Sequence, residues 1–476
     1  MTKDSFDKRN FLFFLNDVYP MRNSDALSGI FTSPTTWDAV AEMVNKARKN
    51  DPLARSVKKL QLYVHVLFCA RLCTFCCTTH VLLKQRSEID AYIKALTRQM
   101  MLFSPVYKGM DADQISFGGG TPSILTEQQL TVILDAVDKA FPNNGRKIFF
   151  EAHPSSWTAS KLEVLSSRGL YRLSIGIQSL EKNVLKLVSR SQTKEKISWC
   201  LRSARKAGVP QLNVDLIAGL PGQTIRGFIK DLKFAIDEGV NTVGLEPYHT
   251  GELTEMCGPG EMIPEFIKRR DDMMKAAAQV LPNAGFHRKG IFGVYTRNQE
   301  PDQRHEEEAY LHLEEAIAGF GPFARGQFPG AVFYRTGGLK PTGDLPDVRA
   351  SVQDYSSAMS NYAVFALIYG LDERVFLKRF GVSLDLHCGE GLRYLKKSGL
   401  VSFSKGIWKF SGELTIRRFH ELVALSKVLY GEEILSLLRT RYLDKYDPKH
   451  DYSKGSSLLK AYAVNSFINW YYRLIY

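Results

Sequence analysis

The stretch QLYVHVLFCARLCTFCC, residues 61–77, decides how this sequence is interpreted. Residues 61–68 are mostly apolar and rich in Val, Leu and aromatic side chains, which predicts a buried strand. Three cysteines follow at the spacing C-x3-C-x2-C, namely Cys69, Cys73 and Cys76. Cysteines gathered directly after a strand indicate a metal site, because a disulfide framework would spread them through a smaller chain.

The spacing of these cysteines suits a 4Fe–4S cluster, in which three thiolates ligate three irons and the fourth iron is left open. A zinc site is the alternative, but zinc prefers four ligands in a tetrahedron and no later C-x2-C pair is present. Cys77 directly follows Cys76, and neighbouring residues rarely ligate the same ion together. Purely structural cysteines are a third interpretation. We therefore expect Cys69, Cys73 and Cys76 to be the metal ligands.

Strands and helices alternate along the chain from this loop onward. Six strand–helix repeats predict an α/β fold with a parallel sheet and right-handed crossovers. Functional groups then lie where strands end and the next loops begin. A partial (β/α)6 barrel of the TIM type fits this pattern, although the pattern alone also allows a doubly wound sheet. The predicted strands cover residues 61–68, 114–117, 147–152, 172–178, 212–217 and 242–248.

The repeat pattern fades after about residue 290, which suggests a modular chain. Helical segments followed by a short hairpin around Ser404-Lys405-Gly406 predict a winged-helix-like module near the C-terminus. We divide the chain into an N-terminal leader (1–58), a barrel (59–290), a connecting segment (291–350), the winged-helix-like domain (351–445) and a basic, aromatic tail (446–476).

A run of glycines follows the second predicted strand, in the sequence Gly118-Gly119-Gly120-Thr121-Pro122. Glycine lets the backbone approach a ligand closely, so the run could bind an amino group through exposed backbone groups. A glycine run alone is weak evidence. One repeat after a C-x3-C-x2-C loop, it is far more specific.

With these motifs, the chain resembles the oxygen-independent coproporphyrinogen oxidase family of radical S-adenosylmethionine (SAM) enzymes, including its haem-chaperone and class C methyltransferase relatives. The resemblance implies a radical SAM barrel, a 4Fe–4S cluster, two bound molecules of SAM, and a flavodoxin- or ferredoxin-type electron donor. The stretches that carry it are residues 62–65, the cysteine loop, 117–122, 172–178 and 213–221.

The resemblance also implies the residues that contact SAM. The molecule on the cluster would meet Tyr63, Gly118 and Glu151. A second molecule would meet Phe75, Gly119, Gly120, Gln178, Arg190 and Asp215. Capping of strand–helix loops is the structural alternative for Gln178 and Asp215, and a surface ion pair is the alternative for Arg190. Two histidines at expected loop positions, His80 and His249, are candidates for proton transfer.

Two departures from the oxidase pattern bear on the reaction. The oxidases carry a further cysteine two places after the third ligand, where this chain has Thr78. Their N-terminal segment rich in Arg and Tyr has no counterpart in residues 20–40. We therefore expect a class C methyltransferase or alkylating enzyme that acts on an unsaturated carbon of a small molecule. An oxidative decarboxylase of the oxidase type and a haem chaperone are the alternatives.

Composition limits the remaining classes of function. The chain has 476 residues, of which 44% are hydrophobic and 24% charged, and a net charge of +13. The basic residues are dispersed, so a basic surface or an anionic substrate explains the charge better than a nucleic-acid partner. Lys396 and Lys397 keep nucleic-acid binding open as a hypothesis. No apolar run reaches the roughly 18 residues that span a bilayer, and we expect a cytoplasmic protein.

Overall fold

The computed structural model describes residues 33–248, 264–289, 293–297 and 313–411. Single positions within these ranges are not described, namely residues 77, 144, 339, 341, 342, 354, 398 and 400. His249 and the tail 446–476 lie outside the described residues.

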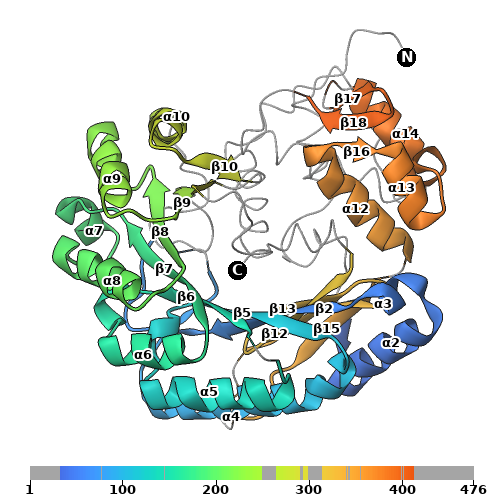
Figure 1. Cartoon of the computed structure of the whole chain (residues 1–476), viewed down its shortest axis with the longest axis horizontal. Helices are drawn as coiled ribbons and strands as arrows, with labels where there is room; N and C mark the ends of the chain where they lie inside the picture. The colour runs from blue at the N-terminus through green and yellow to red at the C-terminus, as the bar shows by residue number, and fades with distance from the viewer. Residues whose placement is uncertain are drawn as a thin grey trace, which may run out of the picture.

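Six parallel strands form the centre of a large curved sheet (Figure 1). Their order across the sheet is their order in the sequence, whereas a doubly wound sheet reverses its order at a switch point. The predicted α/β fold with a barrel-type sheet is therefore confirmed. The strands are β2 (Lys59–Val66), β5 (Asp111–Gly119), β6 (Lys147–Ala152), β7 (Leu170–Gln178), β8 (Gln211–Ala218) and β9 (Thr242–Pro247).

Helices follow these strands and cover the outer face of the sheet (Figure 1). Several begin at a threonine whose hydroxyl accepts a hydrogen bond from a backbone N–H in the first turn, which satisfies an otherwise unpaired donor. At Thr126 a capping box with Gln129 is present. The helices are α4 (Ser87–Phe103), α5 (Glu127–Ala140), α6 (Ala159–Ser167), α7 (Lys182–Leu187), α8 (Lys194–Lys206), α9 (Ile225–Asp237) and α10 (Pro264–Asn283).

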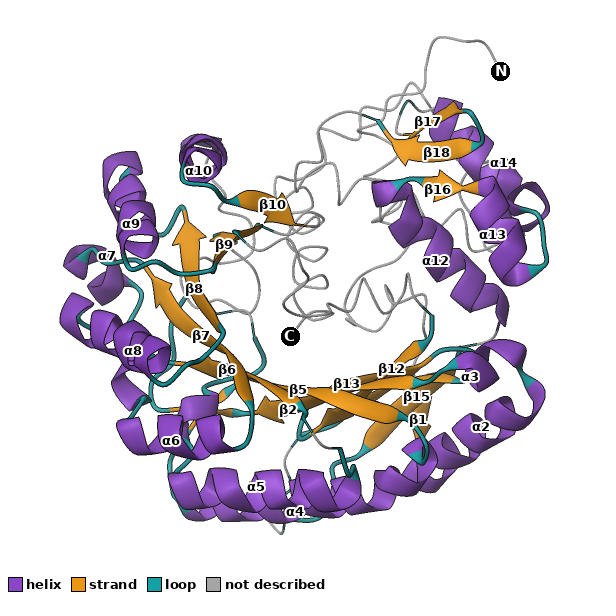
Figure 2. Ribbon diagram, in the orientation of Figure 1, coloured by secondary structure: helices purple, strands orange, loops and turns teal. Residues whose placement is uncertain are grey.

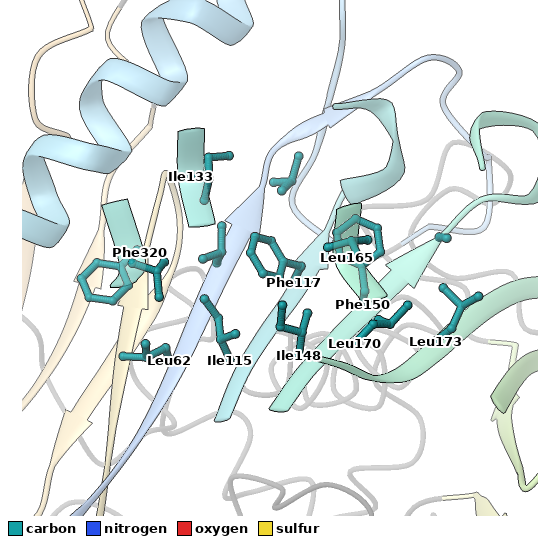
Figure 3. Packing of buried hydrophobic residues seen from close by; sticks show 14 of the residues in the cluster. Leu62, Ile115, Phe117, Ile133, Ile148, Phe150, Leu165, Leu170, Leu173 and Phe320 are labelled. Atoms are coloured by element: carbon teal, nitrogen blue, oxygen red, sulfur yellow. The ribbon is translucent and has the colours of Figure 1, made fainter. Parts of the chain in front are cut away.

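The main core lies between this sheet and its helices, where alternate side chains of each strand point outward (Figure 3). Burial of these apolar side chains is the main force that holds the helices on the sheet. Side chains labelled in the figure include Leu62, Ile115, Phe117, Ile148, Phe150 and Leu173 from the strands and Ile133 and Leu165 from the helices.

The sheet is wider than the sequence predicts, because segments expected to be a leader and a connection add strands to it. β12 (Glu315–Phe320) pairs in parallel with β2 on the side away from β5. Antiparallel strands then extend this edge. They are β13 (Arg325–Phe328), β14 (Val332–Thr336), β15 (Val348–Val352) and β1 (Ser33–Thr35).

The opposite edge carries β11 (Val294–Thr296) and β10 (His287–Lys289), both antiparallel to their neighbours. In the expected leader, α2 (Trp37–Asn50) and α3 (Pro52–Ser56) are regular helices, and α2 buries Trp37, Val40 and Val44. Residues 33–58 and 291–350 therefore include parts of the main sheet and its cover.

A separate three-stranded sheet with helices forms the C-terminal unit (Figure 2). Helices precede a hairpin with its turn at Lys405 and Gly406, both of which have positive φ. This arrangement agrees with the predicted winged-helix-like module. Its elements are α12 (Tyr355–Tyr369), β16 (Leu371–Asp372), α13 (Glu373–Phe380), α14 (Leu384–Lys397), β17 (Val401–Ser404) and β18 (Ile407–Phe410).

Within the described part of the chain, no helix has the length and apolar character needed to cross a membrane.

Candidate functional site

The cysteine loop leaves the barrel at the carboxyl end of β2, through the short strand β3 (Phe68–Cys69). β3 pairs in parallel with β4 (Val81–Leu82), which returns from the loop. The Thr74 amide donates to the carbonyl of Val188, 3.3 Å away, so the loop is also tied to the chain after α7. These backbone contacts join the two ends of the loop, β3 and β4, and attach the loop to the segment that follows α7.

The three predicted ligands are free thiols, each with a polar neighbour. The Thr121 hydroxyl donates to the sulfur of Cys69 at 3.2 Å. Arg190 Nη1 lies 3.7 Å from the sulfur of Cys73. The third thiol, Cys76, interacts with His80. A hydroxyl and two nitrogen groups thus surround the sulfur atoms of the loop.

These neighbours affect how readily each thiol ionises, which matters because a thiol must be deprotonated to bind a metal. Burial raises the pKa of Cys69 to about 12, although its hydrogen bond from Thr121 works in the opposite direction. Burial also raises the pKa of Cys73, against the charge of Arg190. For Cys76, burial opposes ionisation, but the hydrogen bond and charge of His80 together with hydrogen bonds from Thr78 outweigh it, and the pKa of the thiol is lowered.

The donor set fits a cluster better than a single ion. Among the described residues, no group of three or more His, Cys, Asp or Glu converges closely enough to hold one metal ion. A tetrahedral zinc site needs such convergence. A cubane does not, because each cysteine binds a different iron at a separate corner. Cys69, Cys73 and Cys76 would therefore hold a 4Fe–4S cluster with one open iron.

The glycine run lies beside the end of β2, where Gly118 pairs with His65 and Gly119 with Val66. A Cβ on Gly120 would lie within 2.9 Å of the carbonyl oxygens of Val66, Leu67 and Phe68, and one on Gly119 would lie 2.8 Å from the ring of His65. Gly119 also has φ of +101°, which favours glycine. Only glycine fits this close approach. The Gly120 amide donates to the carbonyl of Val66 and the Thr121 amide to that of Phe68, so the run is held against the start of the cysteine loop.

The three residues expected to contact the SAM on the cluster lie together. A Cβ placed on Gly118 would be 3.0 Å from a carboxylate oxygen of Glu151 and 3.2 Å from the Tyr63 hydroxyl. Gly118 is the last but one residue of β5, and Glu151 is the last but one residue of β6. Tyr63 and His65, two residues apart on β2, are joined by a hydrogen bond of 3.1 Å. A small group of polar side chains thus lies beside the cysteine loop, close enough for Cys76 to act on the charge of Glu151.

The acids of the site are held in an environment that favours their neutral forms. Burial raises the pKa of Glu151 to about 8, the charge of Asp215 adds to this shift, and Arg172 opposes it. Burial also raises the pKa of Asp215, against a 2.8 Å hydrogen bond from the Asn213 amide. A neutral Glu151 can donate as well as accept hydrogen bonds, which suits contact with hydroxyl groups.

The raised pKa of Glu151 predicts that the ligand-free protein loses stability as pH rises. The unfolded carboxyl titrates near 4.5 and the folded one near 8, so the folded state holds one more proton between these values. Glu151→Gln removes this titration. We expect the variant to be more stable than wild type at pH 8.5 by about 1–3 kcal/mol, and to show a smaller difference at pH 5.

Chemical unfolding at the two pH values measures this effect. The matched control is Glu163→Gln, which changes an exposed glutamate on α6. If Glu151→Gln and Glu163→Gln shift the unfolding free energy equally at both pH values, Glu151 is not a buried neutral acid.

A second polar group forms where β7 ends. A Cβ on Gly176 would lie 3.1 Å from both Arg190 Nη2 and Gln178 Nε2, and Gly176 pairs with Asp215 on β8. The register shifts between Gly176 and Gln178, and Gln178 has a positive φ of 65°. A bulge of this kind re-aims a side chain and is common at functional sites. Gln178, Arg190 and Asp215 therefore come together, beside Cys73.

The other residues expected at the second SAM are placed differently. Phe75 packs against a small apolar cluster that contains Val184, Val188 and Tyr248. Of these, Val184 and Val188 are close in sequence to Arg190. Gly119 and Gly120 lie beside the end of β2, where a Cβ on either would meet His65 or the carbonyls of residues 66–68. Their contact with a second SAM stays a prediction.

Of the two candidate histidines, His80 is at the site. Its Nδ1 lies within hydrogen-bond distance of the Thr78 carbonyl, and the ring contacts Cys76. His80 therefore lies next to Cys76, one of the predicted metal ligands. The structure leaves its proposed role in proton transfer untested.

Sequence reasoning did not single out three further residues of the site. Thr121 bonds Cys69, Asn213 bonds Asp215, and the buried Arg172 acts on the charges of Glu151 and Asp215. Two signals were available in the sequence. Thr121 directly follows the glycine run, and Asn213 is two residues before Asp215, which places both side chains on the same face of β8.

Comparison with known proteins agrees with this site. Residues 63–235 match the model of the radical SAM superfamily, a range that includes the three cysteines, the glycine run and Arg190. Residues 63–235 therefore form a radical SAM domain. Its cofactors are accordingly a 4Fe–4S cluster and SAM, as predicted from the cysteine and glycine motifs.

Curated radical SAM relatives include the oxygen-independent coproporphyrinogen III oxidase of Escherichia coli, 36% identical over 177 residues. That match covers 37% of this chain and 39% of the oxidase, so the chain aligns with well under half the length of this relative. The heme chaperone HemW of Bacillus subtilis is 25% identical over 364 residues, which is 72% of this chain and 93% of the chaperone.

The fold agrees with that of a solved radical SAM structure, coproporphyrinogen III oxidase (HemN) from Escherichia coli. The TM-score is 0.71 at 22% sequence identity, over 83% of this chain and 95% of that chain. This likeness supports the fold, including the strands that the sequence did not predict. The similarity to the coproporphyrinogen oxidase group, expected from the motifs, is confirmed.

Proposed function

We propose that this chain is a radical SAM enzyme that oxidises a small molecule in the manner of the oxygen-independent coproporphyrinogen III oxidases. One observation carries the proposal: the cysteine loop lies beside the pocket of Tyr63, Gly118 and Glu151. When bound, the cluster and SAM supply a 5′-deoxyadenosyl radical that abstracts hydrogen from the substrate. The relatives favour oxidative decarboxylation over the methyl transfer expected from the sequence.

The chain's own residues would orient the cofactor and substrate. Glu151 and Tyr63 offer hydrogen bonds to hydroxyl groups of SAM, and the backbone of the glycine run offers them to its amino group. A flavodoxin- or ferredoxin-type protein would deliver the electron. Pairing of β3 with β4 and the hydrogen bond from the Thr74 amide to the Val188 carbonyl would keep the three thiols in place to hold the cluster.

Radical methyl transfer is the second candidate, supported by the polar group at the end of β7. Gln178, Arg190 and Asp215 offer an amide, a cation and a carboxyl within one pocket. That combination suits the amino and carboxylate groups of a second SAM. A heme chaperone is the third candidate, which the long match to HemW supports.

One anaerobic experiment separates the three candidates. The reconstituted chain is incubated with SAM, a reductant and coproporphyrinogen III, and the products are identified by mass spectrometry. An oxidase yields 5′-deoxyadenosine and a product that has lost carboxyl groups. A methyltransferase yields S-adenosylhomocysteine and a heavier product. If heme binds tightly and no substrate is consumed, the oxidase proposal is wrong and the chaperone proposal replaces it.

A further inference from the structure

Three arginines stand opposite one another on neighbouring strands at the extended edge of the sheet. Arg325 on β13 pairs with Arg335 on β14, and Arg335 pairs with Arg349 on β15. Strands lie about 4.8 Å apart, so the row is about 10 Å long. Like charges directly opposite each other destabilise a sheet, so this placement is costly unless something compensates for it.

The row lies on the face of the sheet that turns away from the outer helices. Side chains alternate along a strand, and Tyr334, next to Arg335, packs against Trp37 of α2 and Phe103 of α4. Arg335 therefore points to the other face, and its cross-strand partners share that face. Figure 2 shows α2, α4 and α5 along one side of this part of the sheet, while the opposite side turns toward the centre of the molecule.

The arginine row leads toward the radical SAM site. β12 lies between β13 and β2, and Ile317 pairs with Gln327. Continuing this antiparallel register sets Gly319 opposite Arg325, and Gly319 in turn pairs with Tyr63 of β2. Arg325 is thus two strands, or about 10 Å, from Tyr63. Glycine at the intervening position adds no side chain between the cation and the site.

Electrostatics agree with this placement. Burial is the main cause that lowers the pKa of His65 to about 4, and the charges of Arg325 and Arg335 add to the shift. His65 bonds Tyr63, so the same two cations act within the site. Arg325 and Arg335 are partly buried, while Arg349 is exposed. The row therefore runs from the surface toward the pocket.

We propose that Arg325, Arg335 and Arg349 form a docking site for carboxylate groups of the substrate. The inference rests on the proposed function, since it supplies the substrate side of the same site. A planar guanidinium binds a carboxylate through two parallel hydrogen bonds, and a ligand with several carboxylates would offset the repulsion within the row. All three arginines already interact with other groups of the chain, and a ligand would share or replace those contacts.

Titration with a tetracarboxylate tests this site. Coproporphyrin III and its uncharged tetramethyl ester are titrated into the reconstituted full-length chain, and binding is followed by absorbance. We expect the wild type to prefer the acid. Arg335→Gln should weaken binding of the acid about tenfold, and the Arg325→Gln, Arg335→Gln double variant about a hundredfold, because each change removes charge-assisted hydrogen bonds. Binding of the ester should not change.

Arg226→Gln, which alters an exposed arginine on α9, is the matched control and should bind the acid as the wild type does. Arg335→Lys keeps the charge and should give an intermediate Kd. Because Arg335→Gln also removes the contacts that Arg335 makes within the chain, the Tm of the variant is measured beside its affinities.

Several results would overturn the proposal. The first is that Arg335→Gln binds the acid with wild-type affinity. The second is that the wild type does not prefer the acid over the ester. The third is a large fall in Tm together with an equal loss of affinity for both ligands. Formation of 5′-deoxyadenosine from SAM without substrate is measured in the same samples. If the wild-type chain forms no 5′-deoxyadenosine, the proposed radical chemistry is wrong.

Discussion

Replacing any one of Cys69, Cys73 and Cys76 by alanine is expected to remove the cluster and abolish formation of 5′-deoxyadenosine from SAM. A cubane with an open iron has three protein ligands, and two thiolates do not retain it at the site. Iron and sulfide are measured per chain after anaerobic reconstitution, with about four of each in the wild type. Deoxyadenosine is measured in the same samples by chromatography.

Two other cysteines provide controls for this experiment. Cys77→Ala changes the residue next to a ligand, and Cys200→Ala changes a buried thiol on α8, 3.8 Å from the carbonyl of Pro154. Both variants should keep the cluster and the deoxyadenosine. Loss of iron in Cys77→Ala combined with its retention in Cys76→Ala would show that the ligand assignment is wrong.

The barrel was predictable because its signals are local. Long apolar runs end in loops, and several helices carry their own cap and apolar stripe, as Thr126 and Gln129 show for α5. The edge strands were missed because their signals are not local. They are short and lack intervening helices, and α2 acquires its place from contacts such as Trp37 with Tyr334.

Some features of the site could likewise be predicted from the sequence, and others could not. The cysteines, the glycine run and Glu151 follow strands directly, and the carboxyl ends of parallel strands meet, so their proximity follows from the sequence. The orientation of Gln178 does not follow, because it depends on a bulge and a positive φ. Nor does the arginine row, whose members are 10 and 14 positions apart in the sequence and meet only through the strand register.

Arg190 links the two halves of the site, which makes its role testable. Its guanidinium donates to the Gly176 carbonyl and, through Nε, to Gln192 at 2.9 Å, and it approaches the sulfur of Cys73. Two roles are consistent with these contacts. In one, Arg190 clamps the carboxylate of a second SAM or of the substrate. In the other, it stabilises the Cys73 thiolate and so the cluster.

Arg190→Ala is expected to uncouple the reaction and leave the cluster in place. Loss of a bidentate, charge-assisted contact costs about 1.5–3 kcal/mol, so product formed per deoxyadenosine should fall about ten- to a hundredfold. Arg190→Lys keeps the charge near Cys73 without the planar fork and should also couple poorly. Arg202→Ala, which breaks an ion pair with Glu238 on the outer helices, is the control. Iron, deoxyadenosine and product are measured together. A parallel loss of iron and deoxyadenosine in Arg190→Ala, rescued by Arg190→Lys, would instead assign Arg190 to the cluster, since the lysine supplies the charge and only the clamp requires the fork.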